Sequence, residues 1–178
     1  CAEGRELELK GIQDMLVRTF AFGSLGLTPD AMERVCGLIE RRSFKRGDAV
    51  FTAGSRAREL FFLTSGQCTL QRVVHHTTKV TTPDGSAPGV SRGVGSRREM
   101  ANVACMQGPS VLGMHTSSEK PGSGAHVLGA QAVSHVEGLM LSLGDLEGTD
   151  VLVKIKDLAS RAARAQMGAI HTVSGAVE

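Results

Sequence analysis

Residues 41–66, RRSFKRGDAVFTAGSRARELFFLTSG, decide the fold of this chain. Short apolar runs alternate here with single glycines, at Gly47, Gly54 and Gly66. A glycine adopts a positive φ at almost no cost because it lacks a Cβ atom, so these positions suit tight corners between strands. Regularly punctuated short strands of this kind predict a β-sandwich or a β-barrel.

Further strand-like runs lie downstream, over residues 68–75, 102–106, 126–133 and 137–142. Two segments rich in Gly, Ser and Pro interrupt them, residues 83–98 and 116–124, and we interpret both as loops. The first loop should project from a connection between two strands. Shortening it should cost less than about 2 kcal/mol, because loop-closure entropy changes slowly with length.

Two helices are expected before the strands. Residues 6–20 carry apolar side chains at helical spacing, namely Leu9, Ile12, Leu16 and Phe20. The second helix would begin after Thr28, a suitable N-cap residue, with Pro29 at its first position. Its apolar face would consist of Met32, Val35, Cys36 and Ile39.

A third helix is expected after the strands. Thr149 or Asp150 would cap it, and its buried face would consist of Val151, Ile155, Leu158 and Ala162. Gly168 is a suitable residue to end this helix. The weak signals of residues 169–178 leave that stretch as a tail.

Composition limits the classes of function. Hydrophobic residues make up 41% and charged residues 21% of the 178 residues, near the averages for globular proteins, so wholesale disorder is excluded. The net charge of +2 and the 3% aromatic content argue against nucleic acid as a partner. No apolar run approaches the roughly 20 residues of a membrane span. Four widely spaced cysteines favour a reducing, cytoplasmic location.

The stretch from Phe20 to Gln71 resembles the opening half of the cyclic nucleotide-binding domain family. Its motifs appear as Leu27-Thr28-Pro29, the arginine-bearing run 41–48 that ends in Gly47-Asp48, Gly54, and the run 60–66 that ends in Gly66. The resemblance implies an α+β fold, an antiparallel β-roll flanked by N-terminal and C-terminal helices. Residues 1–41 would supply the first helices, 42–142 the roll with its insertion 83–98, and 143–168 the last helices.

The resemblance also implies where a ligand would bind. In the family, a Phe-Gly-Glu turn and a later arginine form a phosphate-binding cassette for cAMP or cGMP. Here Gly113 keeps the turn glycine, Met114 replaces the glutamate, and His126 stands at the arginine position. Met114 cannot accept a ribose hydrogen bond, and neutral His126 lacks the bidentate fork of an arginine. Lys120, protonated His126 or the backbone N–H groups after Gly113 would be the substitutes if an anion still binds.

Other constellations carry weaker signals. The histidines, including His75-His76, His115 and His135, lack standard metal-ligand spacing, so no metal site is expected. No nucleophile elbow, Walker loop or HExxH motif occurs, so we expect no catalytic residues and no enzyme. We interpret Arg97-Arg98 as solvated loop residues and Arg41-Arg42 as cations at a helix end.

The sequence therefore leaves two main hypotheses. The first is a non-catalytic scaffold or protein-interaction module that binds no cofactor, in a larger cytoplasmic assembly such as a cytoskeletal or ciliary complex. The alternative is a functional cAMP or cGMP sensor. A bacterial catabolite-activator-type regulator would need a helix-turn-helix after the last helix, and we reject it. The fold itself should have one core, formed by Phe44, Phe51, Phe61 or Phe62, Leu63, Leu70, Leu139 and Leu141.

Overall fold

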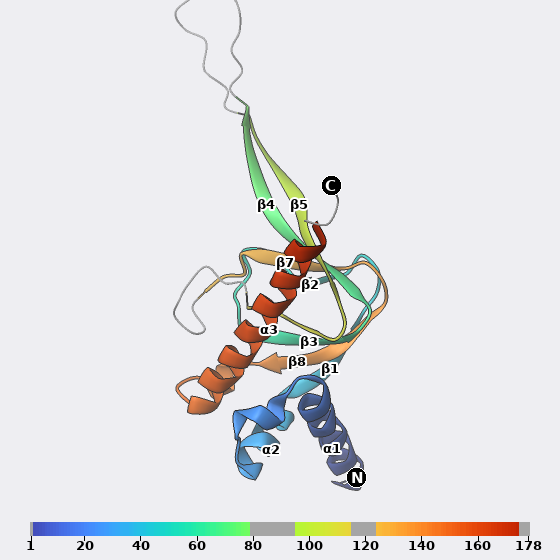
Figure 1. Cartoon of the computed structure of the whole chain (residues 1–178), viewed down its shortest axis with the longest axis vertical. Helices are drawn as coiled ribbons and strands as arrows, with labels where there is room; N and C mark the ends of the chain where they lie inside the picture. The colour runs from blue at the N-terminus through green and yellow to red at the C-terminus, as the bar shows by residue number, and fades with distance from the viewer. Residues whose placement is uncertain (1, 79–94, 115–123, 175–178) are drawn as a thin grey trace, which may run out of the picture.

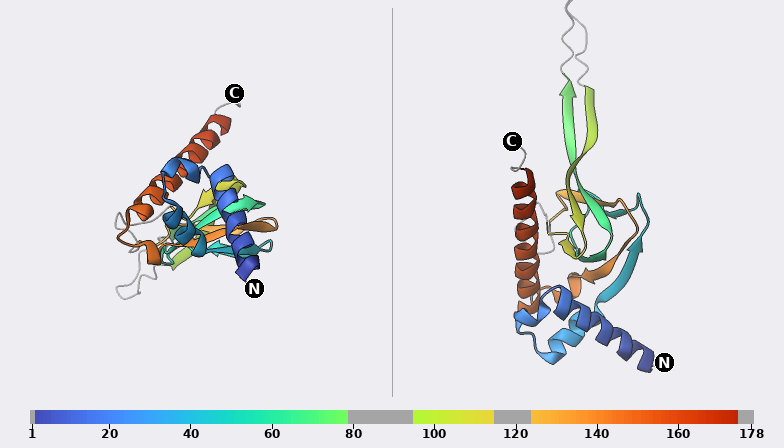
Figure 2. Two further views of the ribbon diagram at one scale, coloured as in Figure 1. Left: turned by 90° about the horizontal axis from the view of Figure 1, so that it is seen from below. Right: turned by 45° about the vertical axis from the view of Figure 1, so that its right-hand side comes forward.

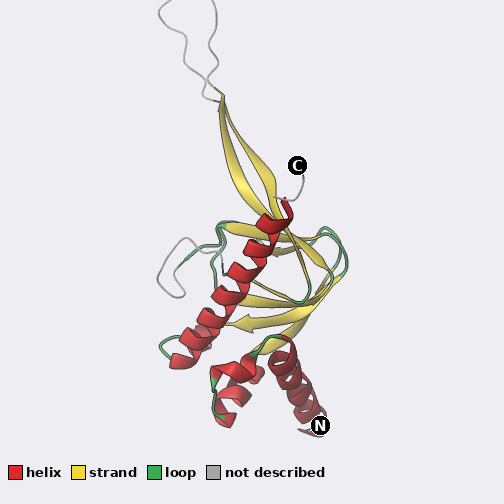
Figure 3. Ribbon diagram, in the orientation of Figure 1, coloured by secondary structure: helices red, strands yellow, loops and turns green. Residues whose placement is uncertain are grey.

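The computed structural model describes residues 2–78, 95–114 and 124–174. Within these ranges the chain forms three α-helices, two short 3-10 helices and two antiparallel sheets of four strands each (Figures 1 and 3). Helices precede and follow the strands in the chain, and the sheets curl into a roll. The expected α+β class and the β-roll with flanking helices are confirmed.

Helices α2 and α3 begin at threonine caps that the sequence provides. They are α1 (Ala2–Thr19), η1 (Phe22–Leu25), α2 (Pro29–Gly37), η2 (Gly144–Leu146) and α3 (Asp150–Ser174). The Thr28 hydroxyl accepts a hydrogen bond from the Ala31 N–H at 3.3 Å, and the Thr149 hydroxyl accepts one from the Leu152 N–H at 3.3 Å. Each bond satisfies a backbone donor that the first turn of a helix leaves unpaired.

The strands are β1 (Ile39–Phe44), β2 (Ala49–Phe51), β3 (Glu59–Ser65), β4 (Gln67–Thr78), β5 (Gly95–Gln107), β6 (Ser110–Leu112), β7 (Leu128–Ala132) and β8 (Val136–Ser142). One sheet has the order β1-β8-β3-β6, and the other has the order β2-β7-β4-β5. Gly47, Gly54 and Gly66 have φ values of 95°, 85° and 92°, so the sequence placed these three corners correctly.

The core is divided by the β1-β8-β3-β6 sheet. Along β3, Leu60 and Phe62 belong to a cluster beneath the helices, whereas Phe61 and Leu63 belong to a cluster inside the roll. Both faces of the sheet are covered because successive strand residues point to opposite sides. The expectation of one core is therefore wrong. The predicted residues split, with Phe62, Leu139 and Leu141 on the helix side and Phe44, Phe51, Phe61, Leu63 and Leu70 in the roll.

Strands β4 and β5 form a ribbon that projects beyond the roll (Figure 1). Their pairing continues to His76 opposite Arg97 and Thr78 opposite Gly95, so the expected strands 68–75 and 102–106 are too short. Residues 95–98 of the expected loop 83–98 are strand, and 83–94 lie outside the described residues. The partner strand overrides the loop-like local composition of Gly95 and Ser96.

Three further boundaries differ from expectation. Helix α3 continues through Ser174, so Gly168 does not end it and residues 169–174 are not a tail. Strand β1 begins at Ile39, so Arg41-Arg42 lie in a strand opposite Leu139 and Gly138 and not at a helix end. Strand β7 begins at Leu128 and leaves the first two residues of the expected strand 126–133 outside it.

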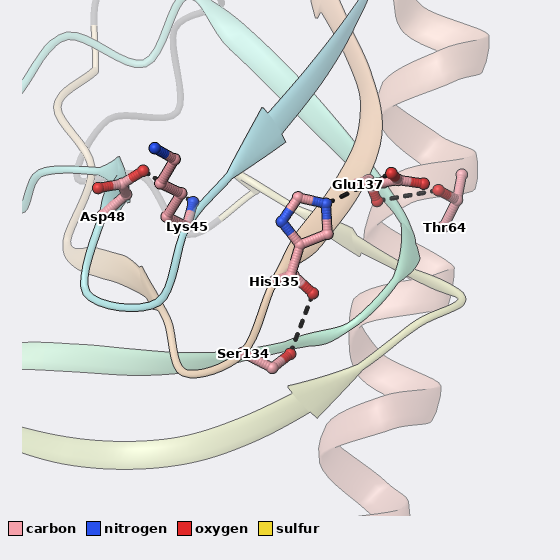
Figure 4. Close-up of polar contacts among 6 residues, drawn as sticks. All are labelled: Lys45, Asp48, Thr64, Ser134, His135 and Glu137. Atoms are coloured by element: carbon pink, nitrogen blue, oxygen red, sulfur yellow. Dashed lines mark hydrogen bonds and ion pairs between the residues drawn. The ribbon is translucent and has the colours of Figure 1, made fainter.

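Polar contacts fix the corner at which β1, β3 and β8 meet (Figure 4). The Asp48 carboxylate accepts a hydrogen bond from the Lys45 N–H at 2.8 Å and closes the turn around Gly47. The Thr64 hydroxyl donates to the Glu137 carbonyl at 2.9 Å, and the Ser134 hydroxyl accepts from the Gln67 N–H at 3.0 Å. These bonds satisfy backbone groups that the sheet ladders leave free.

A substitution at Gly138 tests the packing of the cluster inside the roll. A Cβ atom added there would lie 2.5 Å from both the Phe61 ring and the Phe62 carbonyl oxygen. Because the carbonyl is fixed in the sheet, Gly138→Ala should lower the free energy of unfolding by about 1–3 kcal/mol in urea titrations. Gly144→Ala is the matched control, since an added Cβ meets nothing within 4 Å there. Equal stability of the two variants would contradict this packing.

Candidate functional site

The turn after β6 carries the first element of the expected cassette. Gly113 has a φ of 106°, a conformation that favours glycine. A Cβ atom at this position would lie 2.9 Å from the Glu59 carbonyl oxygen and 3.3 Å from Cζ of Phe51. The close approach to the backbone of β3 and to the Phe51 ring therefore requires glycine on steric grounds as well.

His126 carries the second element, just before β7. The residue is 3% exposed, and its ring centroid lies 4.5 Å from that of Phe51. Its backbone is anchored to the turn after β2, because the His126 N–H donates to the Ser55 carbonyl and its own carbonyl accepts from the Gly54 N–H, both at 2.8 Å. Phe51 therefore contacts His126 and also lies against Gly113, so the fold brings the two cassette positions to one aromatic ring.

The environment of His126 is apolar. Its Nδ1 atom is buried and has no hydrogen-bond partner among the residues that the structure describes. Burial lowers the pKa of the imidazole below its ordinary value, because desolvation disfavours the charged form. The ring is therefore neutral at pH 7 and offers neither a positive charge nor the paired donors of a guanidinium to an anion.

Met114 follows the cassette glycine but belongs to the helix side of the molecule. It is half-buried and packs against the cluster of apolar residues beneath α1, α2 and α3. Its thioether thus contributes to the contact between roll and helices. The remaining expected cassette residue, Lys120, lies outside the described residues, as does His115.

Two residues near the cassette were missed by sequence reasoning. Phe51 was assigned to the core, but its contact with His126 joins positions far apart in the chain, and no local pattern reveals it. Ser110 in β6 is 2% exposed, and its hydroxyl has no partner within the described part of the chain. A serine between a cis-proline turn and two apolar residues gives no signal of such burial.

Other reactive side chains are dispersed. No group of three or more His, Cys, Asp or Glu side chains suited to a metal occurs in residues 2–78, 95–114 and 124–174. Burial raises the pKa of the Cys36 thiol and raises that of Cys68 to about 11, with a smaller contribution from Cys105. These two thiols are therefore poor nucleophiles. None of the described helices is both long enough and apolar enough to cross a bilayer.

No protein-family model and no curated protein sequence matches the chain. Solved structures do match. A protein assigned to cyclic nucleotide binding from Geobacter metallireducens is 16% identical, covers 87% of this chain and 97% of its own, and has a TM-score of 0.59. The sensor domain of the transcriptional regulator DNR from Pseudomonas aeruginosa is 17% identical, with coverages of 96% and 95% and a TM-score of 0.55. The chain has the cyclic nucleotide-binding-domain fold.

A third structure extends the comparison to eukaryotes. The regulatory subunit of a cAMP-independent protein kinase A from Trypanosoma brucei is 12% identical over 88% of this chain, with a TM-score of 0.54. This chain covers 48% of that subunit, so it corresponds to about half of its length. At identities this low, the structural similarity shows a shared fold and nothing more. The shared fold confirms the structural part of the resemblance in the sequence.

The buried imidazole predicts a pH dependence for this cyclic nucleotide-binding-type domain. Since the native pKa of His126 lies below the unfolded value of 6.5, the unfolded chain binds more protons as the pH falls through this region. The stabilisation is complete above pH 6.5 and is lost as the pH falls towards the native pKa. Unfolding free energies in urea should therefore decrease below pH 6.5, by at most about 1.4 kcal/mol per pH unit for this group.

The variant His126→Leu should remove this part of the pH dependence, whereas His135→Gln, which alters an exposed histidine beside Glu137, should retain it. Parallel urea titrations between pH 5 and pH 8 compare the three proteins. An unchanged profile in His126→Leu would show that His126 is charged or solvated in the native state.

Proposed function

We propose that this chain is a non-catalytic protein-interaction module of a larger cytoplasmic assembly, built on a cyclic nucleotide-binding-domain fold whose cassette no longer holds a nucleotide. The observation that carries the proposal is the state of His126. This residue stands where the family has its phosphate-binding arginine, and it is 3% exposed against the ring of Phe51.

The first step of the argument concerns the phosphate. An arginine binds a phosphate through two parallel, charge-assisted hydrogen bonds. A neutral imidazole has a single donor, and its Nδ1 atom faces no partner among the described residues. Loss of one member of a buried charged pair costs roughly 2–5 kcal/mol, which corresponds to about thirty-fold to several-thousand-fold in affinity.

The second step concerns the ribose. The family glutamate accepts hydrogen bonds from the sugar, and a thioether is a weak acceptor. Met114 also packs against the helix-side cluster, so it contributes apolar contact where a carboxylate would need solvent or a partner. Both losses weaken the binding of the same cyclic nucleotide. Together they argue against binding at micromolar concentration.

One of the matching structures supports a role without cAMP. The trypanosome regulatory subunit belongs to a protein kinase A described as cAMP-independent, so that protein pairs this fold with regulation that does not require cAMP. We carry this principle over to the present chain, where the fold would serve to present surfaces to a partner protein.

The rival function is a cyclic nucleotide sensor. One observation favours it: Gly113 retains the left-handed turn, and the fold still brings this turn and His126 to the same ring. The rival requires a cation other than the arginine near the phosphate.

Calorimetric titration with cAMP and with cGMP distinguishes the two functions. We expect no saturable heat for either nucleotide up to about 100 μM, because the arginine fork and the ribose acceptor are both missing. Saturable binding at lower micromolar concentration would refute the interaction-module proposal and establish the sensor.

A rescue experiment tests the cause of the loss. Met114→Glu combined with His126→Arg restores both family residues, and Phe51→Val makes room for the longer arginine side chain. The triple variant should bind at least tenfold more tightly than the unmodified chain. The matched control is Met114→Gln with His126→Leu and Phe51→Val, which restores no charge and should remain without binding. A folded triple variant that binds no better would show that a blocked or reshaped turn causes the loss.

A further inference from the structure

The β4–β5 ribbon is an unusual extension of the roll. Strand β7 pairs with β4 from Cys68 to Arg72, and beyond that point the ribbon consists of two strands among the described residues. It projects beyond the roll, at the end of the molecule opposite α1 and α2 (Figures 1 and 2). Strand β5 is the last strand of its sheet and pairs only with β4 within the described residues. Two strands that extend beyond their sheet gain little stability from packing, so a partner strand could add to this part of the ribbon.

The ribbon carries exposed apolar side chains. Val73 stands opposite Met100, which is 48% exposed, so the two lie on one face of the ribbon. Val103 is 45% exposed and stands where the register shifts between Leu70 and Gln71. Natural edge strands usually carry devices that prevent pairing, such as prolines. Strand β5 has charged side chains over residues 97–99 and a bulge at Val103, but its described residues include no proline, and the apolar side chains of Met100 and Val103 are exposed on it.

Positive charge flanks these apolar residues. Arg72, Arg97 and Arg98 are exposed, and Glu99 is the one carboxylate among residues 71–78 and 95–107. His75 pairs with Arg98 in the register, and His76 lies 3.4 Å from Glu99. Three arginines against one glutamate give this ribbon a charge of +2, as large as the net charge of the whole chain. Charge complementarity therefore selects an acidic partner.

We propose that the free edge of β5 binds an acidic, extended segment of a partner protein, which adds to the sheet as a further strand. Backbone hydrogen bonds to the edge would provide affinity, and alternate side chains of the segment would contact either the apolar residues or the arginines. The proposal rests on the interaction role proposed above and identifies its surface and its kind of partner.

Two other occupants fit less well. A second copy of the chain would bring two positively charged β5 strands together, and like charges opposite each other destabilise a sheet. A nucleic acid would gain few phosphate contacts from three arginines that share the ribbon with Glu99. The unpaired backbone edge also matches a peptide strand, since it offers alternating N–H and C=O groups.

A phage-display selection tests the proposal. Random peptides of about 10 residues are selected for binding to the immobilised full chain. Enriched peptides should alternate apolar residues with Asp or Glu. A synthetic copy of the most enriched peptide should slow amide hydrogen exchange within β5. Its affinity, measured by fluorescence anisotropy, should fall at least tenfold in the variant Arg97→Glu with Arg98→Glu. That variant should itself select peptides rich in Lys and Arg.

The matched control, Arg18→Glu with Arg46→Glu, alters the net charge equally at exposed sites on α1 and in the β1–β2 turn, and should change affinity less than twofold. Enriched peptides without acidic bias, or binding that is insensitive to Arg97 and Arg98, would overturn the proposal. So would tighter binding of a double-stranded DNA probe, or ribbon-dependent dimers in sedimentation. Cyclic nucleotide titration concerns the cassette alone. The proposal for the ribbon and the proposed function can therefore be refuted separately.

Discussion

The structure depends on burying both faces of the β1-β8-β3-β6 sheet. Phe61 and Leu63 of β3 pack inside the roll, while Leu60 and Phe62 pack beneath the helices, and all four are fully buried. Phe62 contacts Phe20 and Phe22 at ring separations of 5.1 and 5.6 Å, which joins the N-terminal helices to the strand. One strand therefore contributes to both clusters and connects the packing of the roll to that of the helices.

This arrangement explains what the sequence revealed and what it did not. Glycine corners and capping residues are local signals, so the strands around Gly47, Gly54 and Gly66 and the start of α2 were predictable. The division of the core was not, because a continuous apolar run such as residues 60–63 is buried on both faces and shows no alternation. The extent of β4 and β5 depends on pairing between distant segments, which outweighs the Gly-Ser composition of residues 95–96.

The sequence also predicted only part of the expected cassette, namely its residue types and not their contacts. Alignment of the family motif onto Gly113, Met114 and His126 identified which residue types are missing, but it did not show what they contact. The ring of Phe51 and the helix-side cluster give His126 and Met114 apolar surroundings. Because both side chains are part of the packing, replacing either one alone with a charged residue would exchange an apolar contact for a buried charge.

Packing at the cassette also bears on where binding takes place. A buried imidazole with an unpartnered Nδ1 costs stability, and a fold tolerates such a cost where the loss stays small against the two large clusters. The β4–β5 ribbon has the opposite character, since the side chains of residues 97–103 in β5 are exposed. An exposed edge can exchange hydrogen bonds with water for bonds to a partner strand without disturbing the core. The ribbon can therefore acquire a binding role while the roll keeps its packing, whereas the cassette cannot change without repacking Phe51.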